Sequence, residues 1–445
     1  MKFIPQLSST LLALLLSAAI AGAQGSYKNV ELTIGHKDGR YQKNETVEVW
    51  ALKHEEDGEK LRLTTIENGQ RSKSALELKA GEKTLILSKA FTEPTAVMLQ
   101  VAPEKDTKSF SAIGFIVAPE EFRPGFEEPA DFTSYWQEQV SRMRESEMKA
   151  TLTPVPFPDE LQKYRTRVEA YDLEISMPEG NPVRAYIAWP AEAEPGSCGI
   201  LICPHGSGVR SSNLKNAVRR ACDSRAIVID INAHGIPNGR DDAFYEELSN
   251  GELKDYRTKY LNAREDCYFR LMYLRMQRVL DYACTLKEWD GEKVALDGTS
   301  QGGGQSAALA GLDPRVRFVI LQVPALTDMG GKLAGHGASW PYYGKFDAER
   351  DGDYLHVLPY YDATNFLRHY RGILWMEGGL IDTTCPPECV FSAYNVAASE
   401  DKSITTYPYR QHGEKRLWEG NYADWRETIG QPRKEALEHY LSHNP

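Results

Sequence analysis

The sequence predicts a chain of two parts: a small all-β sandwich, then an α/β domain with a mostly parallel, doubly wound sheet. Residues 24–119 contain short runs of β-branched and alternating residues between polar turns, without long helical periodicity. From residue 120 onward, near-continuous apolar runs alternate with helical stretches, as in a parallel sheet that helices cover on both faces. A glycine-rich turn around Ser300 joins one of these apolar runs directly to a helix.

The N-terminus resembles a secretory signal. Lys2 precedes an apolar run at residues 11–16, and the small residues Ala21, Gly22 and Ala23 follow, which predicts a signal peptide over residues 1–23. We therefore expect export to the periplasm or to the outside of the cell. The apolar run is too short for a spanning helix, so no membrane insertion is expected. The formal net charge of −11 disfavours nucleic acid as a partner.

The first part, residues 24–119, is expected to be a β-sandwich of immunoglobulin-like size. It shows no catalytic constellation, so we expect a spacer or an assembly surface rather than a glycan-binding module. Polar turns separate its strand candidates, which are Asn29–Ile34, Thr46–Lys53, Leu61–Ile66, Thr84–Leu87, Thr95–Val101 and Ala112–Val117.

The second part, residues 120–445, begins with a linker rich in proline and glutamate and a leading helix, which together span residues 120–148. Apolar residues recur at approximately helical spacing over residues 264–286, so a long helix is expected there. The strand candidates of this part are Arg184–Trp189, Gly199–Cys203, Ala226–Ile231, Val294–Leu296, Arg317–Leu321, Ile373–Met376 and Ile404–Tyr407.

Ser300 is the candidate nucleophile. It stands in Gly298-Thr299-Ser300-Gln301-Gly302, after the apolar run 293–297 and before the helical stretch 303–312. A strand, a G-x-S-x-G turn and a helix form the nucleophile elbow of α/β-hydrolases, in which a sharp turn exposes the serine. The backbone N–H of Gln301 is then expected to face the oxyanion of a reacting ester.

A serine hydroxyl needs a base, and the base needs an orienting acid. Asp382 follows the strand candidate at 373–376, and His412 follows the one at 404–407. The chain order of serine, acid and histidine is that of α/β-hydrolases. We therefore predict a triad of Ser300, Asp382 and His412.

Other residues compete for these roles. Glu377 is an alternative acid but lies nearer to its strand, and Asp382 taken alone is also a candidate helix N-cap. His205 and His234 follow strand candidates as well. Chain order and placement favour His412 as the base.

The second oxyanion donor is expected in the loop after the strand candidate at 199–203, which contains His205-Gly206-Ser207-Gly208. The N–H of Ser207 or of Gly206 is the candidate. A phosphate-binding loop is the rival interpretation, but no Walker-type lysine follows.

From residue 126 to residue 412, the chain resembles the acetyl xylan esterase and cephalosporin C deacetylase family, carbohydrate esterase family seven. The resemblance covers roughly two thirds of the chain and leaves out the all-β part. It rests on Pro129-Ala130-Asp131-Phe132 with Tyr135-Trp136, Gly298-Thr299-Ser300-Gln301-Gly302-Gly303-Gly304, Asp382-Thr383-Thr384-Cys385-Pro386-Pro387, Val390-Phe391-Ser392-Ala393-Tyr394-Asn395 and Gln411-His412-Gly413.

The resemblance implies that the triad removes small acyl groups, chiefly acetyl, from sugars, without a cofactor or a metal. It also implies a homo-oligomer. The alternatives are a prolyl-oligopeptidase-like peptidase, a general carboxylesterase and a non-catalytic glycan-binding protein. Trp340, Tyr342 and Tyr343 offer bulky groups to wall the acyl pocket and bind substrate, with ordinary packing as their alternative role.

The chain departs from the family pattern at three places. Ser207 stands where the family has an aromatic residue, His234 lies where the family has an Arg-Gly-Gln sequence, and Arg275 takes the place of an aspartate. The cysteines number seven, so at least one is unpaired. A disulfide between Cys385 and Cys389 is the less favoured alternative, because two prolines and a glutamate separate the two thiols.

Overall fold

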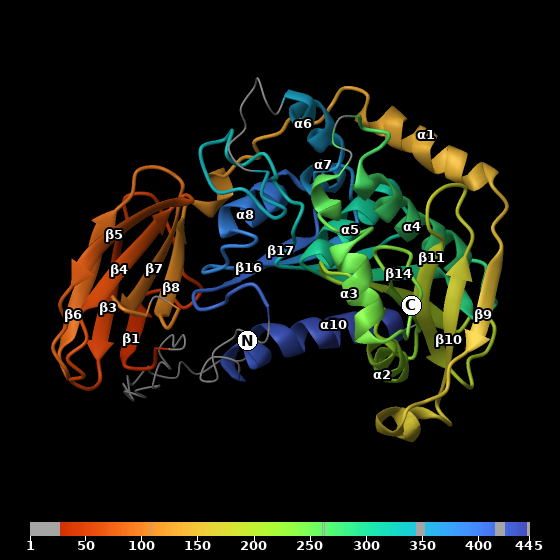
Figure 1. Ribbon diagram of the computed structural model, residues 1–445, viewed down its shortest axis with the longest axis horizontal. Helices are drawn as coiled ribbons and strands as arrows, with labels where there is room; N and C mark the ends of the chain where they lie inside the picture. Colours follow the sequence, from red (N-terminus) through yellow and green to blue (C-terminus); the bar gives the residue numbers. More distant parts are fainter. Residues whose placement is uncertain are drawn as a thin grey trace, which may run out of the picture.

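Three β-sheets organise the computed structural model, which describes residues 27–106, 108–259, 261, 263–343, 352–413 and 423–442. Two smaller sheets form an all-β region at one end of the molecule, and a nine-stranded sheet with helices on both faces forms the rest (Figure 1). The expected fold class is therefore confirmed. The predicted signal peptide, residues 1–23, lies outside the described residues.

The all-β region, residues 27–118, is called the β-domain below. One of its sheets contains β1 (Val30–Ile34), β3 (Thr46–Lys53) and β6 (Lys83–Ala90). The other contains β2 (Arg40–Tyr41), β8 (Ser111–Val117), β7 (Thr95–Pro103), β4 (Leu61–Glu67) and β5 (Gln70–Leu76), in that order. Val49 from the first sheet is buried in one core with Leu99 and Phe115 from the second. The two sheets therefore pack face to face as a sandwich.

The nine-stranded sheet carries the strands that position the site. The six strands from β13 across to β17 run parallel, and three further strands extend the sheet antiparallel. The carboxyl ends of the parallel strands meet at one edge, where active sites of this architecture form. The strand order is β17 (Lys402–Tyr407), β16 (Ile373–Gly379), β15 (Phe318–Gln322), β14 (Trp289–Thr299), β12 (Cys198–Pro204), β13 (Ile227–Ile231), β11 (Val183–Pro190), β10 (Val168–Ile175) and β9 (Ala150–Pro154).

Helices cover both faces of this sheet. On one face lie α2 (Leu214–Ser224) and α10 (Gln431–Ser442), and the small residues Ala217 and Ala221 let α2 approach the strands closely. The opposite face carries α1 (Phe132–Glu145), α4 (Tyr268–Ala283), α5 (Gln301–Leu312), α7 (Ala363–Leu367) and α8 (Pro387–Val396). Further helices are α3 (Asp242–Asn250) and α6 (Gly352–Val357), and short helical turns lie at Pro119–Glu121, Asp159–Tyr164, Tyr256–Thr258, Leu358–Tyr360 and Arg426–Gly430.

The structure contains four strands that the sequence pattern does not predict: β2, β5, β9 and β10. β5 lies at the edge of its sheet and is exposed along nearly its whole length. β9 is likewise an edge strand with mostly exposed residues. Without a buried face, neither strand needs the alternation of apolar and polar residues that marks a strand in a sequence. β2 has only two residues.

All seven cysteines are free thiols, and Cys385 and Cys389 are fully buried. Cys389 lies in the first turn of α8, and its thiol donates to the carbonyl of Gly337 over 3.1 Å. Among the described residues, no helix has both the length and the apolar character needed to cross a bilayer.

Candidate active site

Ser300 lies on a sharp turn between β14 and α5. Its backbone has φ 58° and ψ −126°, a conformation that residues other than glycine rarely adopt. Close packing surrounds the turn: a Cβ on Gly298 would lie 2.2 Å from the carbonyl oxygen of Gly302, and a Cβ on Gly302 would lie 2.1 Å from that of Pro204. Only glycine fits at these two positions, which explains the spacing of the motif. The turn has the strand–turn–helix geometry of a nucleophile elbow.

The three predicted triad side chains form one hydrogen-bonded chain. Oγ of Ser300 lies 2.8 Å from Nε2 of His412, and Nδ1 of His412 lies 2.8 Å from Oδ2 of Asp382. The Asp382 side chain is fully buried, whereas the His412 side chain is 21% exposed. The carboxylate is thus shielded from water while the ring remains open to a substrate. This geometry allows His412 to accept the serine proton while Asp382 orients the ring.

The second oxygen of Asp382 organises the loop around it. Oδ1 accepts the N–H groups of Thr384 at 2.7 Å and of Cys385 at 2.9 Å. The capping role considered from the sequence is therefore partly fulfilled, because Asp382 caps a turn of its own loop rather than the first turn of α8. One carboxylate oxygen fixes the loop and the other fixes His412.

Glu377, the alternative acid, has other partners. It is buried in β16, where its two oxygens accept from Nε1 of Trp425 at 2.7 Å and from Arg433 at 2.8 Å. Nε of the fully buried Arg410 lies 2.6 Å from the same carboxylate. Glu377 thus fastens the C-terminal segment to the sheet, and Asp382 is the acid that contacts His412.

The two alternative histidines are held neutral by burial. Nδ1 of His234 lies 2.6 Å from the Tyr268 hydroxyl, and Nε2 lies 3.2 Å from the carbonyl of Gly208. Burial lowers the pKa of His234 to about 3. Burial also lowers the pKa of His205 to about 4, and Nδ1 of that ring contacts the carbonyl of Gly206. The ring that bonds to Ser300 is that of His412.

Two groups of backbone donors flank Ser300. The N–H of Gln301 belongs to the first turn of α5, where amides lack partners within the helix and the helix dipole favours negative charge. Gly206 also lies close to the serine, because a Cβ built on it would be 3.7 Å from the Cβ of Ser300. Gln301 and Gly206, two of the expected oxyanion donors, therefore lie next to the elbow.

Arg210, which the sequence patterns do not single out, holds the oxyanion loop. Its guanidinium donates to the carbonyl of Ser207 at 2.7 Å and to that of Gly206 at 3.1 Å. The ring of His205 contacts the Gly206 carbonyl as well, at 2.7 Å. Because the C=O and N–H of a trans peptide are fixed in one plane, these contacts set the orientation of the peptide that carries the Ser207 N–H. Arg210 contacts only backbone carbonyls here, so no sequence motif predicts its role.

Trp340 is the predicted substrate-binding residue most closely tied to the elbow. It is buried and packs near Tyr256, whose hydroxyl donates to the side-chain oxygen of Gln301 at 2.5 Å. The backbone N–H of Trp340 donates to the backbone carbonyl of Thr384 at 2.9 Å. Trp340 is thus connected to the loop of Asp382 directly and to the nucleophile turn through Tyr256.

The other two aromatic residues lie in different surroundings. Tyr343 is buried, and its hydroxyl donates to the carbonyl of Arg257 at 2.9 Å. Tyr342 is 46% exposed, donates to the carbonyl of Thr383, and lines a cavity together with Met98 of the β-domain. The structure thus brings Trp340 close to the nucleophile turn and directs Tyr342 toward the β-domain.

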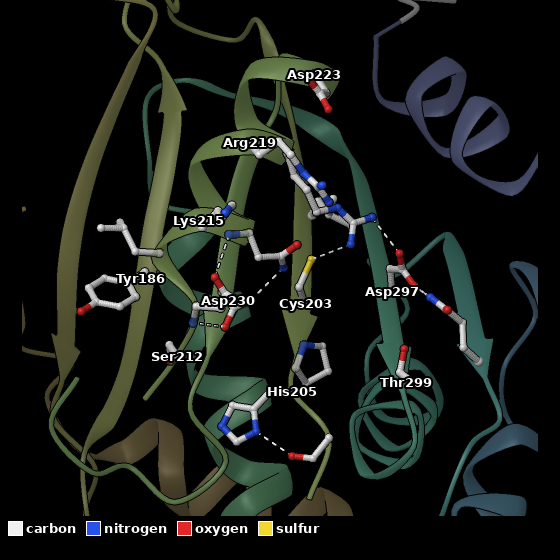
Figure 2. Close-up of a pocket in the computed structure, with 18 of the residues that line it drawn as sticks. Tyr186, Cys203, His205, Ser212, Lys215, Arg219, Asp223, Asp230, Asp297 and Thr299 are labelled. Atoms are coloured by element: carbon white, nitrogen blue, oxygen red, sulfur yellow. Dashed lines mark hydrogen bonds and ion pairs between the residues drawn. The ribbon is translucent and has the colours of Figure 1, made fainter. Parts of the chain in front are cut away.

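A polar cavity begins beside the elbow, where His205 and Thr299 line it, and continues along the sheet below α2 toward Asp223 (Figure 2). Arg220 of α2 donates to Asp297 of β14 at 2.7 Å. Burial raises the pKa of Asp230, on β13, to about 6. These charged residues link α2 to strands that lead toward the oxyanion loop and the elbow.

Two clusters in the described part of the chain combine a carboxylate, an imidazole and a thiol: Asp382, Cys385 and His412, and Asp328, His336 and Cys389. Both ring nitrogens of His412 are engaged within the triad. Those of His336 lie 2.9 Å and 3.1 Å from the carbonyls of Gly337 and Arg123. A ligating imidazole must offer a free ring lone pair to the metal. In the triad, the lone pair of His412 at Nε2 faces the hydroxyl of Ser300, so we assign no metal to the cluster of Asp382, Cys385 and His412.

The comparisons with known proteins match the part of the chain that carries this site. The family model for acetyl xylan esterase (AXE1) matches residues 118–428, a range that contains Ser300, Asp382 and His412. The acetyl esterase Axe7A of Xylanibacter ruminicola is 28% identical over 305 residues, which are 67% of this chain. The matched region spans 66% of the length of that relative.

Two solved structures share the fold. The acetyl xylan esterase from Paenibacillus sp. R4 superimposes with a TM-score of 0.58 at 23% identity, covering 72% of this chain and 98% of that chain. Acetyl xylan esterase 1 from Thermoanaerobacterium sp. JW/SL YS485 gives a TM-score of 0.54 at 24% identity, covering 72% and 97% of the two chains. Both matches support the α/β-hydrolase architecture.

Replacing Arg210 with methionine should lower kcat by roughly tenfold with little change in KM. The loss of an oxyanion-hole donor costs about a hundredfold or more, and a loosened Ser207 peptide should lose part of that. Steady-state kinetics on 4-nitrophenyl acetate would measure the effect. Arg219→Met is the control, because Arg219 lines the same cavity and should keep activity within about twofold. An unchanged kcat in Arg210→Met would remove Arg210 from this role.

His234 should make the folded state sensitive to acid. Its folded pKa of about 3 lies below the value of roughly 6.5 for an unfolded chain, so the unfolded state binds more protons below neutral pH. The stabilisation is complete above pH 6.5 and is lost as the pH falls toward 3, by about 2–3 kcal/mol between pH 7 and 4.5. Urea unfolding at both pH values should show a smaller loss for His234→Gln. Equal losses in the two proteins would contradict the assignment.

Proposed function

The chain belongs to the acetyl xylan esterase family, and we propose on this premise that it is a serine esterase that removes O-acetyl groups from carbohydrates. The observation that carries the proposal is the continuous hydrogen-bonded chain from Ser300 through His412 to Asp382 at a nucleophile elbow. The family match at residues 118–428 supports acetyl esters as the substrate class. Acetylated xylan or xylo-oligosaccharides are the substrates that we infer.

The proposed reaction has two halves. Oγ of Ser300 attacks the acetyl carbonyl while Nε2 of His412 takes the serine proton, and the N–H groups of Gln301 and Ser207 bind the oxyanion. The tetrahedral intermediate collapses as His412 returns the proton to the departing sugar hydroxyl. A water molecule, deprotonated by His412, then attacks the acetyl-enzyme and releases acetate and free Ser300. Asp382 keeps the ring oriented and stabilises its cationic form.

The same triad would serve a peptidase of the prolyl-oligopeptidase type. The β-domain argues against that alternative. A peptidase of that type would carry a propeller of radial blades, whereas β1 to β8 form a two-sheet sandwich. A non-catalytic glycan-binding role is disfavoured by the completeness of the triad. Export and a homo-oligomeric state, both expected from the sequence, remain predictions.

Ser300→Ala should abolish acetyl release while the fold survives. The loss should be at least about a thousandfold in kcat, because only binding and oxyanion stabilisation remain without the nucleophile. Acetate release from acetylated xylo-oligosaccharides and hydrolysis of 4-nitrophenyl acetate would measure it. Ser207→Ala is the matched control: it removes a nearby hydroxyl but keeps the backbone N–H, so activity should stay within about twofold. A Ser300→Ala enzyme with a tenth or more of the wild-type rate would contradict the assignment.

The enzyme should prefer acetyl to longer acyl groups. An additional methylene in a closed pocket costs about 1–3 kcal/mol, or roughly 10–200-fold in kcat/KM, and the bulky Trp340 packs near Tyr256, which bonds to Gln301 beside the nucleophile. Aryl acetate should therefore exceed aryl butyrate by at least about tenfold in kcat/KM. Equal or faster turnover of the butyrate ester would leave a general carboxylesterase on the same triad.

A further inference from the structure

The β-domain contacts both loops that carry the acid and the base of the triad. The acid loop, residues 380–386, follows β16, and the base loop, residues 408–413, follows β17; the β-domain lies beside α8 on this side of the molecule (Figure 1). Gly114 of β8 contacts both loops. Its N–H donates to the carbonyl of Pro408 at 2.9 Å, and a Cβ in its place would lie 2.0 Å from the carbonyl oxygen of Leu380.

Arg40 of β2 makes a second connection. Its Nε donates to the hydroxyl of Thr406 at 3.0 Å, and its guanidinium also donates to the carbonyl of Ile404. The Thr406 hydroxyl in turn donates to the carbonyl of Asp38 at 2.7 Å. Arg40 is thereby bonded to the last strand before the base loop, and its guanidinium lies over the ring of Phe391 in α8.

Apolar side chains next to the triad residues complete this contact. Ile381, which precedes Asp382, packs in one cluster with Met98 and Ala112 of the β-domain. Leu380 packs with Ala96 and Ile116. On the other loop, Tyr409 belongs to the main apolar core of the β-domain. The backbone that leads into Asp382 and the backbone that leads into His412 are therefore both anchored in the β-domain.

We propose that the β-domain is a positioning element of the active site, which holds Asp382 and His412 in register with Ser300 through Gly114 and Arg40. This inference rests on the proposed serine-esterase function and adds a role that differs from the spacer expected from the sequence. The family match begins at residue 118, so all of the β-domain except its last residue lies outside the part of the chain that the match covers.

The triad needs such positioning because its activity tolerates only small displacements of the catalytic side chains. Loops beyond strand ends move more than the strands themselves, while a catalytic constellation must be held within about 0.5 Å of its productive geometry. A displacement of about 1 Å can lower the rate by roughly a hundredfold. Contacts from a rigid sheet at Leu380 and Pro408 restrict both loops where they leave the central sheet.

The test compares Gly114→Ala and Arg40→Gln with wild type in the full-length protein. Gly114→Ala inserts a Cβ against Leu380, and Arg40→Gln removes the guanidinium without adding bulk. A fluorophosphonate that labels Ser300 counts functional sites, and 4-nitrophenyl acetate gives kcat per labelled site and KM. We expect kcat per site to fall by about 10–100-fold, with KM within twofold, and slower labelling. Arg40→Lys, which keeps a cationic donor, should recover part of the rate.

Two controls isolate positioning from stability. Lys89→Met breaks an ion pair with Glu67 that lies wholly within the β-domain. Gly35→Ala adds a Cβ that would lie 3.5 Å from the Tyr41 hydroxyl, which is an ordinary van der Waals contact. Both should keep the wild-type kcat per site. If folded Arg40→Gln does so too, the proposal is overturned, whether or not Gly114→Ala folds. Wild-type protein that the probe does not label at Ser300 would instead refute the proposed function.

Discussion

The reversal of the chain at Ser300 is the constraint on which the rest of the active site depends. A residue other than glycine with φ 58° stores of order 1–3 kcal/mol of strain, so the surroundings must hold it. Gly298 and Gly302 allow backbone atoms to approach where any side chain would collide. With the serine fixed at the end of β14, its partners have to come from loops on the same edge of the sheet. The loops after β16 and β17 meet that requirement.

Buried ion pairs between Glu377 and two arginines stabilise the base loop. The carboxylate of Glu377 contacts Arg410, which stands two residues before His412, and it also binds Arg433 of α10. Removing one member of a buried ion pair costs roughly 3–5 kcal/mol, because the other charge stays behind without a partner. Glu377, which the sequence offered as an alternative acid, therefore helps to hold the loop that contains His412. The C-terminal helix is joined to the active site by the same carboxylate.

Sequence patterns predicted the parts of the site that follow from local chemistry. The glycine spacing around Ser300 is a local signal, Asp382 and His412 each follow a strand candidate, and the structure brings these three side chains together. Arg210 escaped notice because it contacts backbone carbonyls, which any residue offers. The edge strand β5 escaped because it has no buried face. Contacts between Arg40 and Thr406 join residues 366 positions apart, and no local pattern encodes such a pairing.

The close approach of Gly114 to Leu380 also bears on the history of the chain. A domain added at the N-terminus is usually thought of as a cassette that recombination can exchange freely. Here the contact between the β-domain and the acid loop, called the seam, contains Gly114, where a side chain of any size would collide with the backbone of Leu380. A replacement domain would have to supply glycine at that point together with a matching surface for Leu380 and Ile381. The two parts are thus expected to be inherited together and to change by paired substitutions across the seam.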